Sequence, residues 1–347
     1  MLDDSNVLKQ RDPHGALTVA AEQWKQANYE IGVEDAAHDG RPLTKVVVAG
    51  MGGSALAAGI VKSWLGGRME VPFEIVRSYD LPGYVDSSTL VIASSYSGNT
   101  EETVNCLHEA RDTFSQVAVI AAGGHLLDVA KHQSIAHVAL PADLQPRMAM
   151  IYNLRGLVAL LVNFGIVPIS TLDEVAYASE WLREATEKWL PAVGTERNQA
   201  KQLALLAVGK TPVFYGGTLT APVAYKWKIS WNENAKNVAT WNEYPEVNHN
   251  EFIGWTSHPI EKPFAVFDII SSFEHPRILK RFEVSDRLLS GMRPKATSVH
   301  LQGETPLEQL LWGCVLADFV SIYVAILNNV DPVPVVLIEK FKKELND

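Results

Sequence analysis

The sequence predicts an α/β protein of two domains, each built on a parallel sheet flanked by helices. The chain has 347 residues, of which 47% are hydrophobic, and this length and composition support about two domains with buried cores. Short apolar runs alternate with helical segments, which is typical of right-handed crossovers in a parallel sheet. The alternation starts again near residue 212, so we expect a second domain of similar construction.

The first half of the chain contains five predicted strands. Residues 1–40 are expected to form an amphipathic, helical arm. Short segments rich in apolar residues, typical of strands, follow at residues 45–49, 71–77, 90–94, 117–121 and 135–140. A helix is predicted at 55–64, ended by Gly66 and Gly67, because glycines commonly stop helices.

The second half is helical over residues 148–207 and then returns to alternating elements. Its predicted strands lie at 212–215, 264–269 and 297–301, and its predicted helices at 219–236, 276–290, 306–328 and 334–345. No low-complexity linker separates the halves. We therefore place a helical arm at residues 1–40, a first domain at 41–165 and a second domain at 166–347.

The composition restricts the possible partners. A net charge of −10 argues against a nucleic-acid surface, although a local group of donors can bind a small anion. Cys106 and Cys314 form no motif, which is typical of a reducing compartment. The acidic N-terminus lacks the apolar core of a signal peptide, so we expect a cytoplasmic protein. The histidines show no metal-ligand spacing, and we expect no metal or cofactor.

One segment resembles a membrane span in its composition. Residues 310–327 are mostly apolar, but Asp318 lies near their middle. A charge there costs roughly 2.5–3.5 kcal/mol on insertion scales. We therefore expect a buried core or subunit-interface helix and no membrane partner.

A turn rich in hydroxyl groups follows the strand predicted at 90–94. Ser95, Ser97 and Thr100, which we call the hydroxyl cradle, precede a predicted helix, and Gly98 allows the backbone to approach closely. The helix start adds unpaired N–H groups and the positive end of its dipole. These are the components of a phosphate site. The alternative is a Ser/Thr-capped helix that binds no ligand.

A glycine-rich turn at residues 50–55 follows the strand predicted at 45–49. It is a weak match to a dinucleotide-binding fingerprint, which needs an acidic residue about 20 positions later. That region holds Arg77, Ser78 and Tyr79, and the first acidic residue, Asp80, comes later than the fingerprint requires. A sugar or phosphate therefore fits this turn better than a dinucleotide. Together the two turns resemble the phosphosugar-binding module called a sugar isomerase (SIS) domain, which serves both enzymes and sensors.

The residues that would decide between these functions lie in two polar segments, 231–236 and 242–251. An aldose–ketose isomerase needs a carboxylate to move a proton between two carbons. It also needs a group that opens the sugar ring, for which histidine is suited near neutral pH, and a cation that stabilises the enediolate.

Four motifs resemble the bifunctional phosphoglucose/phosphomannose isomerases of archaea and bacteria from about residue 45 to the end. They are segments 145–147, 232–236, 243–251 and 331–334, the last followed by Lys340. The resemblance implies two SIS domains, each a flavodoxin-like, three-layer α-β-α arrangement. It also implies metal-free interconversion of glucose 6-phosphate and fructose 6-phosphate, with possible mannose 6-phosphate activity, through a cis-enediol.

The resemblance further implies roles for individual residues. Glu233 matches the base, and His249 matches a ring-opening histidine contributed by the neighbouring subunit, which implies a homodimer. Arg147 matches the arginine beside the enediolate, and Lys340 a lysine at the ring oxygen. The matching phosphate and sugar contacts are Gly53, Ser54, Ser95, Ser97, Thr100 and Val333.

Each role has an alternative in the sequence itself. Glu243, Glu246 and Glu251 are competing bases, and His249 could cap a loop. Arg147 could form a surface ion pair of little energetic value, and Lys340 lies in a segment that also reads as a solvated helix face. As a whole, the chain could instead be a non-catalytic phosphosugar sensor, or an isomerase of another phosphosugar such as an amino sugar.

Two positions depart from the family pattern. Ala55 replaces a usual glycine and slightly crowds the first turn. Val333 replaces a threonine that is linked to acceptance of both C2 epimers. Valine has a similar size but cannot form a hydrogen bond, so we expect weaker turnover of mannose 6-phosphate than of glucose 6-phosphate.

Overall fold

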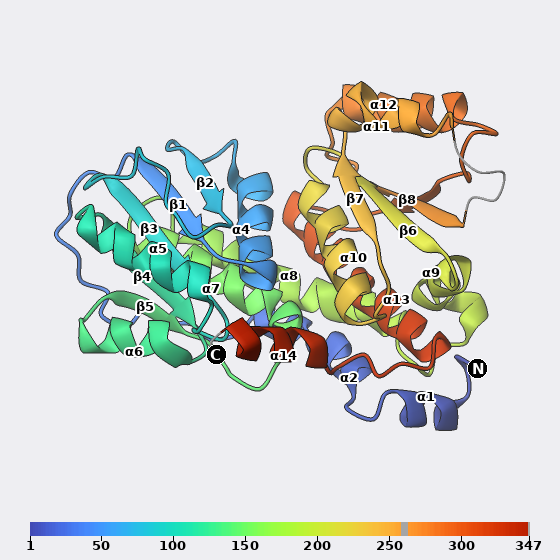
Figure 1. Cartoon of the computed structure of the whole chain (residues 1–347), viewed down its shortest axis with the longest axis horizontal. Helices are drawn as coiled ribbons and strands as arrows, with labels where there is room; N and C mark the ends of the chain where they lie inside the picture. The colour runs from blue at the N-terminus through green and yellow to red at the C-terminus, as the bar shows by residue number, and fades with distance from the viewer. Residues whose placement is uncertain (258–262, 346–347) are drawn as a thin grey trace. The chain divides into compact units, whose positions relative to one another are not determined.

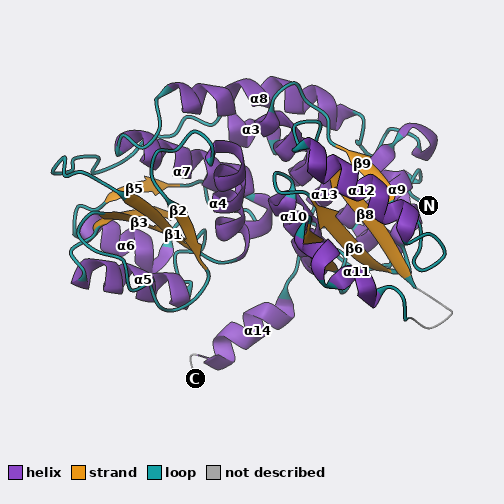
Figure 2. Ribbon diagram, turned by 90° about the horizontal axis from the view of Figure 1, so that it is seen from above, coloured by secondary structure: helices purple, strands orange, loops and turns teal. Residues whose placement is uncertain are grey.

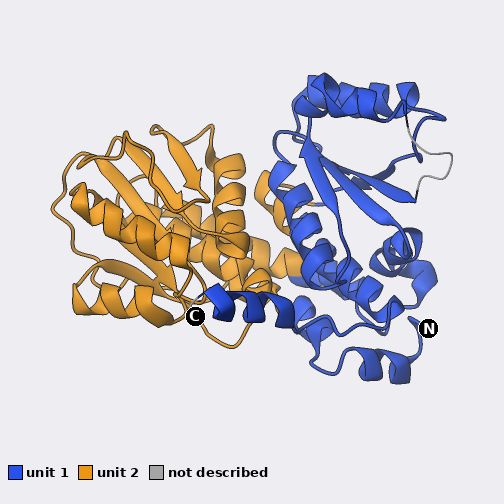
Figure 3. Ribbon diagram, in the orientation of Figure 1, with its two compact units in different colours: residues 1–21, 183–302, 312–347 blue, residues 22–182, 303–311 orange. Residues whose placement is uncertain are grey.

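The structure is a computed structural model that describes residues 1–257 and 263–345. Figure 1 shows the order of its elements along the chain. Two compact units are present (Figure 3). Unit 1 comprises residues 1–21, 183–302 and 312–347, and unit 2 comprises residues 22–182 and 303–311. The domain boundaries drawn from the sequence motifs remain a prediction.

Unit 2 contains a five-stranded, fully parallel sheet in the order β2-β1-β3-β4-β5. Its strands are β1 (Lys45–Ala49), β2 (Phe73–Val76), β3 (Thr89–Ser94), β4 (Gln116–Ala121) and β5 (Ala136–Ala139). The apolar runs form strands because almost every residue in β1 and β3 is buried, as expected when helices cover both faces of a sheet. The chain order reverses beside β1 and β3, where ligands commonly bind in such sheets.

Helices cover both faces of this sheet (Figure 2). They are α4 (Gly52–Leu65), α5 (Glu101–Asp112), α6 (Gly124–His132) and α7 (Met150–Asn163). Helix α8 (Ser170–Glu187) follows α7 along the chain. Leu107 of α5 and Leu126 of α6 pack with Val119 on one face. On the other face Gly156 of α7 lies against Val138, which an added Cβ would approach to 3.3 Å. The predicted three-layer arrangement is confirmed.

Unit 1 contains a four-stranded parallel sheet in the order β7-β6-β8-β9, which follows the same topology as β2-β1-β3-β4. Its strands are β6 (Thr211–Gly216), β7 (Thr240–Glu243), β8 (Phe264–Ile270) and β9 (Thr297–His300). Its helices of eight or more residues are α9 (Gln199–Ala207), α10 (Ala221–Glu233), α12 (Pro276–Leu288), α13 (Pro306–Leu327, which begins in unit 2) and α14 (Val336–Leu345).

The two faces of this sheet are packed differently. Ile278 and Phe282 of α12 cover one face with Val266. On the other face Phe214 contacts Trp227 and Trp231 of α10, with ring centroids 5.4 Å apart in both pairs. Aromatic packing of this kind adds about 0.5–1.5 kcal/mol per pair beyond area burial, and it fixes the axis of α10 on the sheet.

The structure differs from the sequence prediction at β7. The segment 242–251 reads as irregular, but Thr240–Glu243 pairs in parallel with β6. Its side chains are mostly exposed, and Trp241 is the one apolar residue among them. They show no apolar alternation, because β7 is an edge strand that packs on one neighbour only. The 3₁₀ helix η3 (Glu246–His249) and the short helix α11 (Glu251–Gly254) follow it.

The N-terminal arm also differs from its prediction. Its helical part ends at residue 27 and consists of α1 (Ser5–Arg11), α2 (Ala16–Glu22) and α3 (Trp24–Ala27). Asp12 stops the first helix and starts the second, since its carboxylate accepts the Ala16 N–H at 2.7 Å. Side chains that bond nearby backbone groups favour such turns over a continuous helix.

Helix α13 is the one described helix that is long and apolar enough to cross a membrane by length and composition. Its most apolar window is 94% buried within the structure, as in the core helix of a globular protein. Asp318 in this helix pairs with Lys226 at 2.6 Å, and both side chains are fully buried. The pair explains how an apolar helix tolerates a carboxylate, because buried charges require partners.

Both cysteines are free and buried. Burial raises the pKa of Cys106 to about 11 and the pKa of Cys314 to about 12, because the thiolate is disfavoured away from water. Neither thiol therefore ionises near neutral pH.

Candidate functional site

The turn between β1 and α4 approaches the segment that carries Arg147. A Cβ added at Gly53 would lie 2.7 Å from the Pro146 carbonyl oxygen and 3.5 Å from the Arg147 Cα. Any larger residue would displace the 3₁₀ helix η1 (Pro146–Met148). Ser54 connects this turn to the next one, since its hydroxyl oxygen accepts the Tyr96 N–H at 3.2 Å. Two predicted substrate contacts, Gly53 and Ser54, thus lie beside Arg147 and the hydroxyl cradle.

The hydroxyl cradle lies in the turn between β3 and α5. The Ser95 hydroxyl lies 2.8 Å from the Thr100 hydroxyl and 3.4 Å from the Ser97 hydroxyl. Thr100 is the N-cap residue of α5 but forms no side-chain capping bond. Its hydroxyl therefore faces the other hydroxyls, and the first N–H groups of the helix are left for another acceptor.

The backbone of this turn requires glycine. Gly98 has a φ of +69°, and a Cβ added there would lie 1.7 Å from the Gly123 carbonyl oxygen. No side chain fits such a space. Gly98 thus brings the turn against the next loop and holds the three hydroxyls in place.

A fourth hydroxyl at the start of α5 did not stand out in the sequence. Thr103 is 1% exposed, and its Oγ1 has no hydrogen-bond partner among the described residues. A buried hydroxyl without a partner is uncommon in folded proteins. Its spacing from Thr100, one helical turn, was the signal that could have identified it.

Arg147 is buried, with 2% of its surface exposed. The alternative of an exposed surface ion pair is therefore wrong. One guanidinium nitrogen donates to Gln145 Oε1 at 3.4 Å. Because arginine stays charged, the buried guanidinium favours an anion nearby.

Glu233 is the last residue of α10, and buried contacts to α13 hold this helix. Lys226 pairs with Asp318, whose Oδ1 also accepts the Ser230 hydroxyl at 2.7 Å. The Trp227 indole N–H donates to the Gly313 carbonyl oxygen at 3.0 Å. Glu233 itself is half-buried.

The structure brings Glu233 close to the segment that carries Val333. Lys236 donates to the Glu233 carbonyl oxygen at 2.6 Å and to the Pro332 carbonyl oxygen at 3.0 Å. The Asp331 carboxylate in turn accepts the Val333 N–H at 3.0 Å. Two motifs separated by about one hundred residues therefore meet through one lysine.

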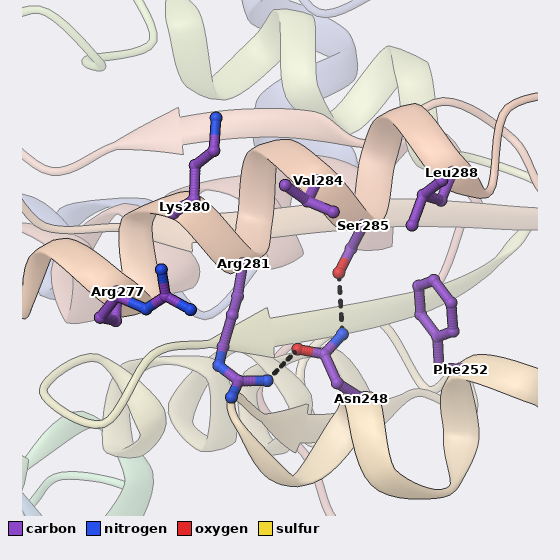
Figure 4. Close-up of a pocket in the computed structure, with 8 residues that line it drawn as sticks. All are labelled: Asn248, Phe252, Arg277, Lys280, Arg281, Val284, Ser285 and Leu288. Atoms are coloured by element: carbon purple, nitrogen blue, oxygen red, sulfur yellow. Dashed lines mark hydrogen bonds between the residues drawn. The ribbon is translucent and has the colours of Figure 1, made fainter.

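His249 is exposed at the end of η3, and its neighbour in sequence is firmly held. The Asn248 amide donates to Ser285 Oγ at 2.9 Å and accepts from Arg281 at 2.9 Å (Figure 4). A cavity of about 310 Å³ lies beside these groups. Helix α12 thus fixes the backbone on which His249 is presented to solvent.

The three carboxylates that compete with Glu233 for the role of base differ in their surroundings. Glu251 accepts the Tyr215 hydroxyl and, at 2.7 Å, the Asn242 amide. Burial and the neighbouring Glu251 raise the pKa of Tyr215. Glu251 is therefore engaged in anchoring the loop. Glu243 and Glu246 are exposed.

Lys340 lies on α14, where every residue from 336 to 345 is exposed. It pairs with Glu344 at 3.5 Å, and both side chains are about two-thirds exposed (68% and 66%). This is the solvated helix face of the alternative interpretation, and a catalytic role of Lys340 remains a prediction. Among residues 1–257 and 263–345, no group of three or more His, Cys, Asp and Glu side chains could hold a metal ion.

Comparison with known proteins shows what the chain resembles. Residues 196–345 match the family described as bacterial phospho-glucose isomerase C-terminal SIS domain. The bifunctional phosphoglucose/phosphomannose isomerase of Caldicellulosiruptor bescii is 34% identical over 92% of this chain and 95% of that protein. The protein of the same description from Aquifex aeolicus is 33% identical over 90% and 93%.

A solved structure matches the fold along almost the whole chain. The glucose-6-phosphate isomerase like protein from Thermus thermophilus superposes with a TM-score of 0.64, covering 99% of this chain and 98% of that one. At 17% identity, this likeness concerns the fold alone. It agrees with the two parallel sheets described above.

Proposed function

This chain belongs to the bifunctional phosphoglucose/phosphomannose isomerase family, and on that basis we propose that it interconverts glucose 6-phosphate and fructose 6-phosphate. The observation that carries this proposal is the hydroxyl cradle. Its hydroxyls gather at an uncapped helix start, the chemistry that a phosphoryl group needs. A coupled assay with fructose 6-phosphate, reading glucose 6-phosphate and mannose 6-phosphate separately, tests it.

Because we propose that the hydroxyl cradle binds the phosphoryl group, we expect the variant Thr100→Val to bind substrate more weakly. We expect KM for fructose 6-phosphate to rise about 10- to 100-fold, because a hydrogen bond to a charged group contributes about 1.5–3 kcal/mol. Steady-state kinetics measure this change. Thr113→Val is the matched control, since its hydroxyl contacts Ser115 at 2.8 Å beyond the far end of α5. An unchanged KM in Thr100→Val would remove the cradle from the proposal.

We propose that Glu233 carries the proton between C1 and C2 of the open-chain sugar. A single carboxylate can remove a proton from one carbon and return it to the other. Arg147 would stabilise the enediolate, because its guanidinium is fixed, buried and permanently charged. The engagement of Glu251 with Tyr215 and Asn242 supports Glu233 over that competitor. Lys340 would assist at the ring oxygen.

We propose further that His249 opens the sugar ring in the active site of a partner subunit, which makes the enzyme a homodimer. The exposure of His249 on a firmly held loop supports this proposal. A histidine can exchange a proton near neutral pH. A symmetric dimer would place each His249 at the partner's site.

Mixing two inactive variants tests the shared site. Glu233→Gln and His249→Ala chains, unfolded together and refolded, should regain about one quarter of wild-type sites, because half of randomly formed C2 dimers are mixed and each holds one intact site. The activity of the mixture is compared with each variant refolded alone. No recovery, with mixed dimers demonstrated by differently tagged chains, would place both residues in a single protomer's site.

The departure at Val333 predicts a preference between epimers. We expect kcat/KM for mannose 6-phosphate to lie below that for glucose 6-phosphate. Val333→Thr should raise the mannose-to-glucose ratio about 2- to 10-fold, since a restored hydrogen bond contributes about 0.5–1.5 kcal/mol. Val333→Ala is the control for altered volume without a hydroxyl. Comparable values for the two sugars in the wild type would contradict this expectation.

The second candidate, a non-catalytic sensor, would bind fructose 6-phosphate and leave it unchanged in the coupled assay. Incorporation of solvent deuterium at C2 of glucose 6-phosphate would exclude it. We also propose a cytoplasmic location, which the two free, buried cysteines support, because reduced thiols are typical of that compartment.

A further inference from the structure

A cavity of about 320 Å³ lies in unit 1 beside the loop that joins α12 to β9. We call this cavity the loop pocket. Three of the described residues that line it are cations, Arg287, Arg293 and Lys295, and one is an acid, Asp286. Its volume falls within the range of small-molecule sites, about 300–1,000 Å³. The loop pocket is therefore large enough for a small ligand, and its lining has an excess of two positive charges.

The loop pocket is not a second copy of the hydroxyl cradle. The cradle follows the carboxyl end of β3, whereas the loop 289–296 precedes the amino end of β9 at Thr297. Ligands of parallel sheets commonly bind beyond the carboxyl ends of the strands. The sheet topology therefore does not account for the cations that gather here.

The guanidinium of Arg293 lines the loop pocket and is buried with most of its donors unused. Only 1% of the side chain is exposed. Nη1 donates to the Pro294 carbonyl oxygen at 3.2 Å, but Nε and Nη2 have no hydrogen-bond partner within the described part of the chain. Arginine keeps its charge, and buried polar groups without partners are uncommon in folded proteins. The unused donors therefore point to an acceptor that enters from outside the chain.

Two carboxylates near Arg293 balance its charge only in part. Asp286 Oδ1 lies 3.5 Å from Nη2, and the same oxygen accepts the Ala296 N–H at 3.1 Å. Asp268 is 2% exposed, and its Oδ1 also has no hydrogen-bond partner among the described residues. Burial raises the pKa of Asp268 to about 7, against the lowering effect of Arg293, so this carboxyl group is only partly ionised near neutral pH.

The other two cations are exposed residues on either side of Arg293 in sequence. Arg287 belongs to the last turn of α12, and Lys295 follows Pro294 in the loop. A cation in the last turn of a helix is favourable by itself, so Arg287 alone would indicate no ligand. The gathering of Arg287, Lys295 and the buried Arg293 around one cavity is what indicates an anion.

We propose that the loop pocket binds a phosphate-class oxyanion, which accepts hydrogen bonds from Nε and Nη2 of Arg293 and is neutralised further by Arg287 and Lys295. A phosphoryl group carries about −1.5 to −2 charges near pH 7, close to the positive excess of the lining, whereas a single carboxylate would balance half of it. Arginine commonly binds such oxyanions with two parallel N–H bonds. Binding at this site is separate from the proposed isomerisation and does not depend on turnover.

Isothermal titration of the full chain with inorganic phosphate, in chloride buffer at constant ionic strength, tests the proposal. The double variant Arg287→Gln with Lys295→Gln should weaken phosphate binding at the loop pocket about 10-fold or more, because hydrogen bonds to charged groups are among the strong ones. Both side chains are exposed, so the fold should be retained. Phosphate bound in the hydroxyl cradle contributes equally to wild type and variant, and the difference reports the loop pocket. Equal binding by the two proteins would overturn the proposal.

The matched control is the double variant Arg277→Gln with Lys280→Gln. It removes the same two kinds of charge from the other end of α12, outside the loop pocket. Phosphate binding should stay at the wild-type level. An equal loss in both double variants would indicate a general effect of net charge and would also overturn the proposal.

Arg293→Lys separates the guanidinium from its charge. Lysine keeps a cation beside Asp286 but lacks the planar pair of N–H donors, so phosphate affinity should fall about 10-fold or more while the tryptophan fluorescence of the folded chain is retained. An unchanged affinity would rule out donation by the guanidinium. Should this variant not fold, the exposed double variant decides the proposal by itself.

A second titration, with fructose 6-phosphate, identifies the source of the phosphoryl group. A loss of fructose 6-phosphate binding in Arg287→Gln with Lys295→Gln would assign the loop pocket to a phosphorylated sugar. A loss confined to inorganic phosphate would assign it to the free anion. A loss with neither ligand would contradict the assignment of this cavity to a phosphate-class oxyanion.

Discussion

Glu233→Gln is expected to reduce kcat for conversion of fructose 6-phosphate to glucose 6-phosphate by about 10²- to 10⁴-fold, the range attributed to a positioned general base. The amide preserves the size and most contacts of the side chain but cannot take the proton. KM should change little, because Glu233 lies outside the hydroxyl cradle. Incorporation of solvent deuterium at C2 should fall in parallel with kcat.

The matched control for this variant is Glu246→Gln, which removes an exposed carboxylate from the nearby polar segment. It should retain activity close to that of the wild type. The dissociation constant of fructose 6-phosphate, measured by calorimetry, separates binding from chemistry. If Glu233→Gln kept its kcat while Glu243→Gln lost it, the base would be assigned to Glu243.

Asp318→Ala should lower the free energy of unfolding of unit 1 by about 3–5 kcal/mol, the usual cost of removing one partner of a buried ion pair. Lys226 would keep its charge without the carboxylate 2.6 Å away. The Ser230 hydroxyl would also lose its acceptor. Urea unfolding followed by tryptophan fluorescence measures this loss, since Trp227 and Trp231 lie on the affected helix.

Two further variants show whether burial causes the effect. Glu283→Ala breaks the exposed pair with Lys280 and should cost no more than about 1 kcal/mol. The double variant Lys226→Met with Asp318→Leu should recover most of the stability, because apolar replacements of a buried pair are often neutral. A loss in Asp318→Ala no larger than that in Glu283→Ala would contradict the prediction.

The sequence predicted the helices, strands and turns that form because of their own residues and near neighbours in the chain. Strand β3 is a continuous apolar run, and the turn after it combines Gly98 with hydroxyl residues, so composition and spacing were sufficient there. Strand β7 was missed because an edge strand with mostly polar, exposed side chains gains its stability from backbone pairing with β6. No local pattern reports that pairing.

The sequence also could not predict contacts between segments that are far apart in the chain. Asp318 appeared as a charge in an apolar segment, and only the fold shows Lys226 beside it.

The state of the two thiols has a practical consequence for spectroscopy. Cys106 and Cys314 are buried, and their pKa values are raised to about 11 and about 12, so maleimide reagents will find little thiolate on the native protein. A cysteine introduced at an exposed position of α14, such as Lys342, can therefore carry a fluorophore or spin label in an otherwise unmodified background. Site-specific distance measurements on this enzyme can begin without a cysteine-free variant.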